Sequence, residues 1–261
     1  MPTLASILAE TRTRVSHLER KGAGFAQLVG KAPAAKPFLH TPGTLVGVIA
    51  EVKRRSPSQG AIRPDLDPVT SARSYERGGA VAVSVLTEQR HFGGSIEDLR
   101  QVAAAVSVPV LRKDFIIHPT QVLEARIAGA SAVLLIARIL ERRQLQELAA
   151  AIRELSMTPL IEVHAAGELD AAFAADPEVL GVNARDLDTL ELNPDRAVEV
   201  MHRVPPGVTL VAESGVQTRD DVERLAGAGA DFVLVGTSVA RHDDPEQAVR
   251  ALTGVQRRPR R

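Results

Sequence analysis

Short runs of apolar residues recur along the chain, and most of them are continuous rather than alternating with polar residues. Continuous runs rich in Val, Leu and Ile are typical of parallel strands whose two faces are both buried. Eight such runs predict strands at residues 45–52, 80–86, 108–114, 131–136, 158–163, 179–183, 208–214 and 231–236.

Segments with helical periodicity separate these runs. They lie at residues 67–79, 95–106, 118–130, 141–156, 164–176, 193–204, 218–230 and 244–254. Asp67 and Ser95 belong to residue types that cap helix N-termini, and several segments end in Gly-Ala or Gly-Gly. Eight alternating units favour the α/β class and a closed (β/α)8 TIM barrel. The alternative is an open doubly wound sheet, but no G-x-G-x-x-G follows the first run.

The 261 residues suit one barrel domain. Residues 1–44 carry one helical pattern and then a Pro/Gly-rich connection, which predicts an extra helix packed on the barrel. The barrel itself is expected over residues 45–254, and the basic residues 255–261 are expected to be a frayed tail. The N-terminus has only a short apolar stretch before Glu10. This pattern does not fit a signal peptide or a membrane span, so the expected location is the cytoplasm.

Composition narrows the function classes. Lys plus Arg and Asp plus Glu each number 32, so the charge balance gives no support for a nucleic-acid or membrane-surface role. The chain has no Cys, which excludes disulfides, thiolate catalysis and Cys-based metal sites. The histidines show no metal-ligand spacing, and we expect them at the surface or at helix starts. These histidines include His40, His91, His118 and His164.

Charged side chains gather at the carboxyl ends of the predicted strands, where the active site of a TIM barrel lies. Glu51 and Lys53 share one face of the first strand, because successive side chains point to opposite faces. Lys113, Glu162 and Glu213 end three other strands. Since buried charges need partners, we expect these residues to neutralise one another in a pocket and to have shifted pKa values.

Two turns near the end of the chain predict a phosphate site. AESG (212–215) and VGTS (235–238) end the last two strands, each with glycine and a hydroxyl before a helical segment. Backbone N–H groups at such turns bind phosphate, and this barrel commonly binds it there. The candidate residues are Ser214, Gly215, Gly236, Thr237 and Ser238. The loop SPSQG (56–60) is a candidate lid.

Seven stretches, in family order, resemble the indole-3-glycerol phosphate synthase family of tryptophan biosynthesis. They are IAEVKRRSPSQG, SVLTEQRHFGGSIEDL, LRKDFIIHPTQVLEARIAGASAVLLI, IEVH, GVNARDLDTLELN, VAESGV and FVLVGTSV, within a resemblance that runs from about residue 4 to about residue 252. The resemblance implies a lyase that closes the ring of 1-(2-carboxyphenylamino)-1-deoxyribulose 5-phosphate. The products are indole-3-glycerol phosphate, carbon dioxide and water, and the family uses neither cofactor nor metal.

The resemblance also implies site residues. The catalytic positions of the family fall on Glu51, Lys53, Lys113, Glu162, Asn183, Glu213 and Ser214. Its binding positions fall on Ser56, Phe92, Phe115, Leu134, Arg185, Leu187, Gly215, Gly236 and Ser238, with Phe92 and Phe115 around the anthranilate ring. The implied partner is a small molecule, with no nucleic acid and no membrane. A monomer is expected, and an oligomer is left open.

The chemistry of that reaction suggests roles for these residues. The ketone must be polarised before the aromatic carbon attacks it, and Lys113 is our candidate general acid. Lys53 would hold the substrate carboxylate, and Glu162 is the candidate base for dehydration. Glu51 and Asn183 would bind hydroxyls and orient the lysines. The sequence leaves open which lysine acts in each step.

Two other classes remain as alternatives. A phosphoribosylanthranilate isomerase is disfavoured by the absence of Cys, whereas a Schiff-base aldolase could use Lys113. A non-catalytic phosphosugar-binding barrel would keep the glycine turns and lose the charged residues. Arg138, which departs from the family pattern near the barrel mouth, is expected to be a surface arginine.

Overall fold

The computed structural model describes residues 3–21, 24–39, 43–258 and 260, and within them the chain forms a closed barrel of eight parallel strands. The strands are β1 (Gly47–Val52), β4 (Ala82–Leu86), β5 (Val110–Lys113), β6 (Ala132–Ile136), β7 (Thr158–Val163), β8 (Val179–Asn183), β9 (Thr209–Glu213) and β10 (Phe232–Val235). Their order around the barrel is β1-β10-β9-β8-β7-β6-β5-β4. All eight predicted strands, and the TIM barrel, are confirmed.

The barrel closes where β1 pairs with β10, with Gly47 opposite Phe232. A Cβ atom at Gly47 would overlap the Phe232 ring, so this position needs glycine. Strand residues are buried on both faces, as their continuous apolar runs predicted. One face packs inside the barrel and the other packs beneath the helices.

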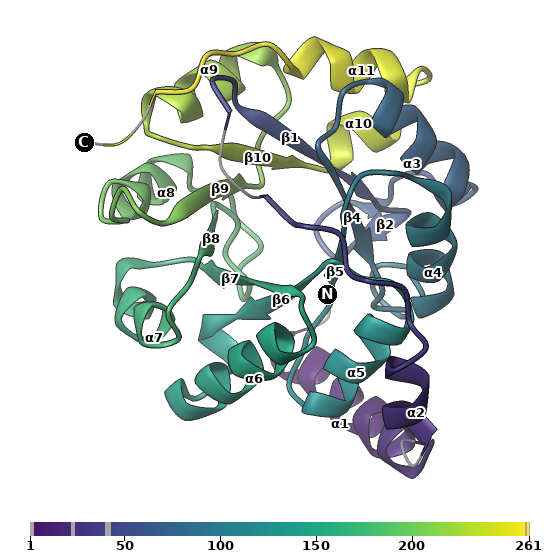
Figure 1. Cartoon of the computed structure of the whole chain (residues 1–261). Coiled ribbons are helices and arrows are strands. Elements are labelled where there is room, and N and C mark those ends of the chain that lie inside the picture. The colour runs from purple at the N-terminus through teal and green to yellow at the C-terminus, as the bar shows by residue number, and fades with distance from the viewer. Residues whose placement is uncertain (1–2, 22–23, 40–42, 259, 261) are drawn as a thin grey trace.

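Helices form a ring around the strands (Figure 1). They are α3 (Pro68–Arg77), α4 (Ile96–Ala105), α5 (Pro119–Ile127), α6 (Arg142–Glu154), α7 (Leu169–Ala174), α8 (Pro194–Met201), α9 (Arg219–Gly227) and α11 (Pro245–Leu252). The predicted caps are confirmed. Asp67 accepts from the Thr70 N–H at 2.7 Å, and Ser95 accepts from the Asp98 N–H at 3.0 Å.

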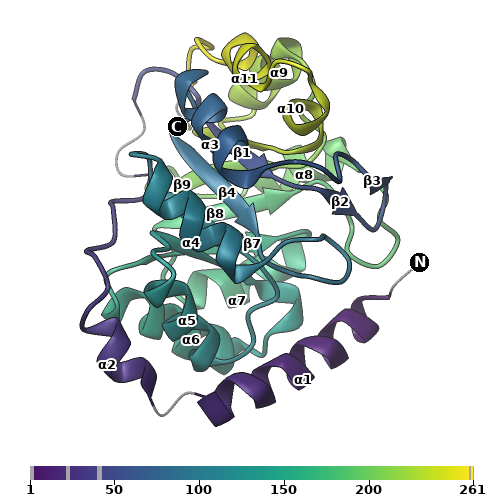
Figure 2. The ribbon, with the colours of Figure 1, turned by 90° about the vertical axis from the view of Figure 1, so that its right-hand side faces the viewer.

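The N-terminal extension forms α1 (Leu4–Lys21) and a short α2 (Phe25–Val29). Figure 2 shows α1 along the outside of the barrel next to α5 and α6, with its N-terminal end on the side of the β2–β3 hairpin. That hairpin pairs β2 (Arg55–Ser56) with β3 (Gly60–Ala61) inside the segment predicted as a loop. The other elements beyond the prediction are η2 (Ala137–Ile139), η3 (Ala166–Glu168) and α10 (Thr237–Arg241).

The C-terminal tail differs from the expected frayed end in its described residues. Arg257 and Arg260 both contact Asp231, at 2.5 and 3.3 Å, and the Arg257 N–H donates to the Thr44 carbonyl. These contacts fasten the tail beneath the barrel, because Asp231 immediately precedes β10. Within the part of the chain that the structure describes, no helix combines the length and apolar character needed to cross a membrane.

Candidate active site

A cavity of about 360 Å³ opens at the carboxyl ends of the barrel strands. Sixteen of the seventeen predicted site residues line it: Glu51, Lys53, Ser56, Phe92, Lys113, Phe115, Leu134, Glu162, Asn183, Arg185, Leu187, Ser214, Gly215, Gly236, Thr237 and Ser238. Glu213 lies behind this lining and reaches the cavity through its contact with Lys113. The predicted residues are therefore gathered at one place, although they come from all eight barrel strands and the segments that follow them.

Lys113 occupies the centre of the charged side of the cavity. It ends β5, and its Nζ lies 3.3 Å from Glu162 Oε2 and forms a second ion pair with Glu213. Burial disfavours the charge of Lys113, but Glu213, Glu162 and Glu51 together raise its pKa above the ordinary value. The side chain is thus an ammonium at rest and can give up a proton.

The two carboxylates on Lys113 differ in character. Burial and the nearby charge of Glu162 raise the pKa of Glu213 to about 8. Burial also acts on Glu162, but Lys113 and His164 hold its pKa below the ordinary value. Since the two acids are coupled, the proton is best assigned to the pair, with Glu162 as the ionised member. Gly181 on β8 makes room for them, because a Cβ atom there would overlap Glu213 Oε1.

A second ion pair lies at the end of β1. Glu51 Oε1 is 2.8 Å from Lys53 Nζ, and burial of Glu51 is outweighed by Lys53 and Lys113, which lower its pKa. Gly236 follows β10 directly beside this pair. A Cβ atom on Gly236 would lie 2.5 Å from Glu51 Oε1 and 2.9 Å from Lys53 Nζ. Gly236 therefore leaves space for the ion pair, in addition to its place in the predicted phosphate turn.

The opposite side of the cavity is apolar. The Phe92 and Phe115 rings lie 6.3 Å apart between centroids, tilted by 44°. Leu134 contributes from β6, and Leu4 and Ile7 reach the cavity from α1. The sequence signal for Leu4 and Ile7 was present as the apolar stripe of this helix, but it predicted only packing on the barrel. Their position makes α1 part of the pocket wall.

The segment after β8 is arranged by its own polar contacts. Asn183 Oδ1 accepts from the Arg185 N–H at 3.0 Å, and Arg185 Nη1 donates to the Leu190 carbonyl at 2.7 Å. Arg138 is exposed, as expected for a surface arginine, and contacts Asp186 and Asp188 at 3.2 and 2.6 Å. It thereby ties η2 to the rim segment that carries Arg185 and Leu187.

Two backbone turns face each other after β9 and β10. Ser214 and Gly215 have φ angles of 67° and 81°, and this left-handed conformation is unusual for serine. Ser238, in the first turn of α10, donates its Oγ hydrogen to the Val216 carbonyl at 3.1 Å and so connects the turns. Arg241 also lines the cavity here. The sequence reasoning missed it because α10 was not predicted.

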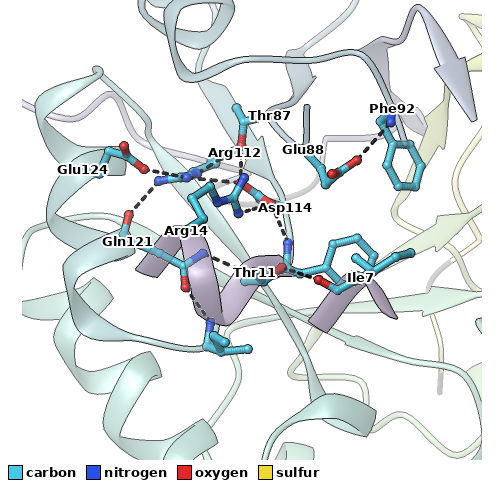
Figure 3. Close-up of polar contacts among 12 residues, drawn as sticks. Ile7, Thr11, Arg14, Thr87, Glu88, Phe92, Arg112, Asp114, Gln121 and Glu124 are labelled. Carbon is cyan, nitrogen blue, oxygen red and sulfur yellow. Dashed lines mark hydrogen bonds and ion pairs between the residues drawn. The ribbon is translucent and has the colours of Figure 1, made fainter. Parts of the chain in front are cut away.

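A separate charged network supports Lys113 and Phe115 from outside the barrel (Figure 3). Asp114 accepts from Arg14 of α1 at 2.7 Å and from Thr87 at 2.6 Å. Arg112 donates to Asp114 at 3.1 Å and also to Gln121 and Glu124 of α5. The residues on both sides of Lys113 are therefore fixed by contacts that do not involve Glu51, Lys53, Glu162 or Glu213, although Asp114 also borders the cavity.

The predicted histidine positions are only partly right. His118 caps α5, as expected for a helix start. His164 is buried with 1% of its surface exposed, so the expectation of a surface or helix-start histidine is wrong for it. His164 Nε2 lies 3.2 Å from Glu162 Oε1, within the charged side of the site. His40 lies outside the described residues.

Glu10, Glu88 and His91 form a cluster close enough to hold a cation. The Glu88 carboxylate, however, accepts backbone N–H bonds from Arg90, His91 and Phe92 at 2.7 to 3.0 Å. Both of its oxygens are thus committed to shaping the turn that carries Phe92. The hydrogen bonds of Glu88 explain this cluster as part of a turn, and the proposed site does not require a cation there.

Comparisons with known proteins agree with the geometry. The family model described as indole-3-glycerol phosphate synthase matches residues 4–252. A protein of that name from Nocardioides sp. is 49% identical over 231 residues, covering 88% of this chain and 89% of the relative. One from Mycobacterium ulcerans is 46% identical over 250 residues, covering 94% and 92%. A solved 3-hexulose-6-phosphate synthase from Salmonella typhimurium shares the fold at a TM-score of 0.65 and 14% identity, over 79% of this chain and 96% of that chain.

Proposed function

The chain belongs to the indole-3-glycerol phosphate synthase family of carboxy-lyases, and on that premise we propose how its cavity closes the indole ring. The substrate is 1-(2-carboxyphenylamino)-1-deoxyribulose 5-phosphate. The observation that carries the proposal is the Lys113 ammonium, held between Glu162 and Glu213 in a cavity with one charged and one apolar side. This arrangement supplies an acid, a base and an aromatic binding surface together.

The cavity offers a separate place for each part of the substrate. The aromatic ring would lie against Phe92 and Phe115, which are the aromatic residues of the apolar side. The phosphate would bind the facing turns at residues 214–215 and 236–238, where glycine leaves backbone N–H groups accessible. The substrate carboxylate would lie near Lys53. These placements bring the ketone, between ring and phosphate, toward Lys113.

Ring closure comes first in the proposed sequence. The aromatic carbon that bears the carboxylate attacks the ketone carbon, and Lys113 donates a proton to the ketone oxygen, which becomes a hydroxyl. The carboxylate then leaves as carbon dioxide, and its bonding electrons return to the ring system. Lys53 holds the carboxylate until this step. Because the carboxylate leaves as a neutral molecule, the whole reaction takes up one proton per turnover.

Dehydration completes the indole. The new hydroxyl is protonated and leaves as water, while Glu162 removes a proton from the ring intermediate. Glu162 suits this role because its neighbours keep it ionised. Glu51 and Asn183 would bind substrate hydroxyls and hold the lysines in place. The proposal needs only a small-molecule partner, and we retain the cytoplasm and a monomer as the expected setting.

The test is a fluorescence assay of purified protein with the carboxyphenylamino-deoxyribulose phosphate, without added metal or cofactor. The indole product fluoresces, and the chain has no Trp that would contribute background. Steady growth of the signal, also in EDTA, is expected. A folded protein that gives no signal would overturn the proposed activity.

A Schiff-base mechanism is a second candidate that the geometry disfavours. A nucleophilic lysine must be neutral, whereas two carboxylates hold Lys113 as an ammonium. Borohydride added during turnover should therefore leave the mass of the protein unchanged. A stable adduct on Lys113 would contradict its role as a general acid and would indicate covalent catalysis.

A further inference from the structure

His164 is enclosed beside the proposed catalytic base. It follows β7 and lies two residues after Glu162, on the same face of the extended chain. Its ring nitrogens contact two different acids. Nε2 lies 3.2 Å from Glu162 Oε1, and Nδ1 lies 3.5 Å from Glu168 Oε2. This buried, titratable group has no role in the mechanism proposed above.

The contacts of Glu162 show what His164 adds. Lys113 contacts one oxygen of the Glu162 carboxylate, Oε2 at 3.3 Å, and His164 contacts the other, Oε1 at 3.2 Å. Two cations on opposite oxygens fix the plane of a carboxylate more firmly than one cation does. The other charged groups that face this site are Glu213 from β9 and the Glu51–Lys53 ion pair from β1. Lys53 pairs with Glu51, so His164 supplies the second positive charge that contacts Glu162.

Glu168 completes the arrangement on the far side of the ring. Its Oε2 accepts a hydrogen bond from the His164 backbone N–H at 2.7 Å. The backbone of His164 therefore holds the carboxylate that contacts the His164 ring. Burial alone would favour the neutral ring, but Glu162 and Glu168 raise the pKa of His164 to about 9. The charges then alternate from the cavity outward in the order Lys113, Glu162, His164, Glu168.

Both ring nitrogens of His164 face carboxylates, Nε2 that of Glu162 and Nδ1 that of Glu168. Among the described residues, neither contact has the alignment of a regular hydrogen bond. The ring is therefore held between two acids by its charge as well as by its hydrogen-bonding nitrogens.

We propose that His164, held by Glu168, is a positioning residue for Glu162: it fixes one oxygen of that carboxylate and keeps it ionised for proton removal. The proposal rests on the function proposed above. It assigns His164 no contact with the substrate. It predicts that loss of the imidazolium lowers the ionised fraction of Glu162 at acidic pH without removing the base.

The experiment is His164→Asn, followed by the pH dependence of kcat/KM in the fluorescence assay. Without the cation, Glu162 should protonate at higher pH. The acid limb of the profile should therefore move up by about one pH unit, so that kcat/KM falls about tenfold on that limb and by less at neutral pH, where Glu162 stays ionised. The matched control is His118→Asn, since His118 also contacts a carboxylate, Glu19 at 3.3 Å, but lies outside the cavity. The control should keep the wild-type profile.

Glu168→Gln tests the outer end of the same chain. This substitution should shift the acid limb in the same direction by a smaller amount, because the imidazole stays in place with less charge. In the double variant with His164→Asn, the second change should add no further loss, because Glu168 acts only through His164. Losses that multiply would overturn the positioning role of Glu168.

The outcomes separate this inference from the proposed function. If wild-type protein shows no turnover, the proposed activity fails. If wild-type protein turns over and His164→Asn keeps its pH profile, only the role of His164 fails. Circular dichroism and thermal melting check that each variant is folded. Should His164→Asn not fold, His164→Gln and the Glu168→Gln profile, in which His164 is intact, decide the question.

Discussion

Strand β5 separates two buried clusters of charge. Lys113 forms ion pairs with Glu162 and Glu213 inside the barrel. Its chain neighbours Arg112 and Asp114 instead contact residues of α5 and α1 (Figure 3). Both clusters contain acids and bases removed from water. They differ in how many hydrogen bonds their carboxylate oxygens accept.

The outer cluster is closed. Asp114 accepts two bonds on each oxygen: Oδ1 from Arg14 and the Phe115 N–H, and Oδ2 from Thr87 and Arg112, at 2.6 to 3.1 Å. A carboxylate that accepts four bonds makes the local structure rigid and has no acceptor position left for a ligand, although Arg14 Nε in the same cluster has no partner among the described residues.

The inner cluster is open. Glu51 Oε2 and Glu213 Oε1 are buried, yet in the described chain they have no hydrogen-bond donor. An unsatisfied buried oxygen is unfavourable unless something else uses it, and substrate hydroxyls could do so. The two clusters thus differ in their acids: Asp114 is fully paired and stabilises the fold, whereas the buried carboxylate oxygens without donors among the described residues belong to Glu51 and Glu213 in the cavity.

Lys113→Ala should give the largest effect. Removing the proposed acid should lower kcat by about a thousandfold, within the range expected for general acid catalysis. Circular dichroism should still show a folded barrel, since the outer cluster is intact. Lys36→Ala is the control, because Lys36 binds the Val106 carbonyl and does not line the cavity. Near-normal kcat in Lys113→Ala would remove its acid role.

Asp114→Ala should act mainly on stability. It leaves Arg112 and Arg14 without their shared acid, so the free energy of unfolding should fall by about 3 to 5 kcal/mol. The measurement is urea denaturation followed by circular dichroism. Turnover of the folded fraction should fall much less than in Lys113→Ala. If activity collapses while stability is kept, the two clusters do not divide their tasks as described.

Gly236→Ala should disturb both ion pairing and phosphate binding. The added Cβ overlaps the Glu51–Lys53 pair, and crowding of about 1 to 3 kcal/mol corresponds to a loss of roughly tenfold to a hundredfold in kcat/KM. Because the Glu51–Lys53 pair is catalytic in the proposal, we expect kcat to fall and KM to rise. Gly227→Ala, where no atom lies within 4 Å, is the matched control. A change in KM alone would restrict Gly236 to the phosphate turn.

Glu213→Gln should change the pH dependence of stability. The pKa of Glu213 is raised to about 8 from an ordinary value of 4.5. Between these values the folded protein binds more protons than the unfolded chain, so this residue makes stability fall as pH rises. Glu213→Gln should flatten that decline in urea midpoints, and the exposed Glu147→Gln should leave it unchanged. Parallel curves for wild type and Glu213→Gln would contradict the raised pKa.

The sequence predicted features that depend on neighbouring residues of the chain. Each strand end was visible as an apolar run followed by a charge, as in Glu51 and Lys113, and the barrel rule brought those ends together. The capping roles of Asp67 and Ser95 were visible for the same reason, because a cap and its partner are three residues apart.

Other features depend on atoms from distant segments and could not be predicted. Gly181 is needed because Glu213 extends from the next strand, and nothing near residue 181 shows this. His164 is buried because η3 brings Glu168 against it. Arg14 reaches Asp114 only after α1 has packed on the barrel. Such contacts are set by closure of the whole fold rather than by local pattern.

The seam between β1 and β10 has a consequence for how the protein is made. Because Gly47 pairs with Phe232, β1 leaves the ribosome long before its partner and must wait with an unpaired edge. The Glu51–Lys53 pair also lacks its neighbour Gly236 until then, since Gly236 follows β10 directly. The last strand to be synthesised therefore both seals the barrel and completes the pocket. We expect a nascent chain that stalls before β10 is synthesised to aggregate and to lack activity.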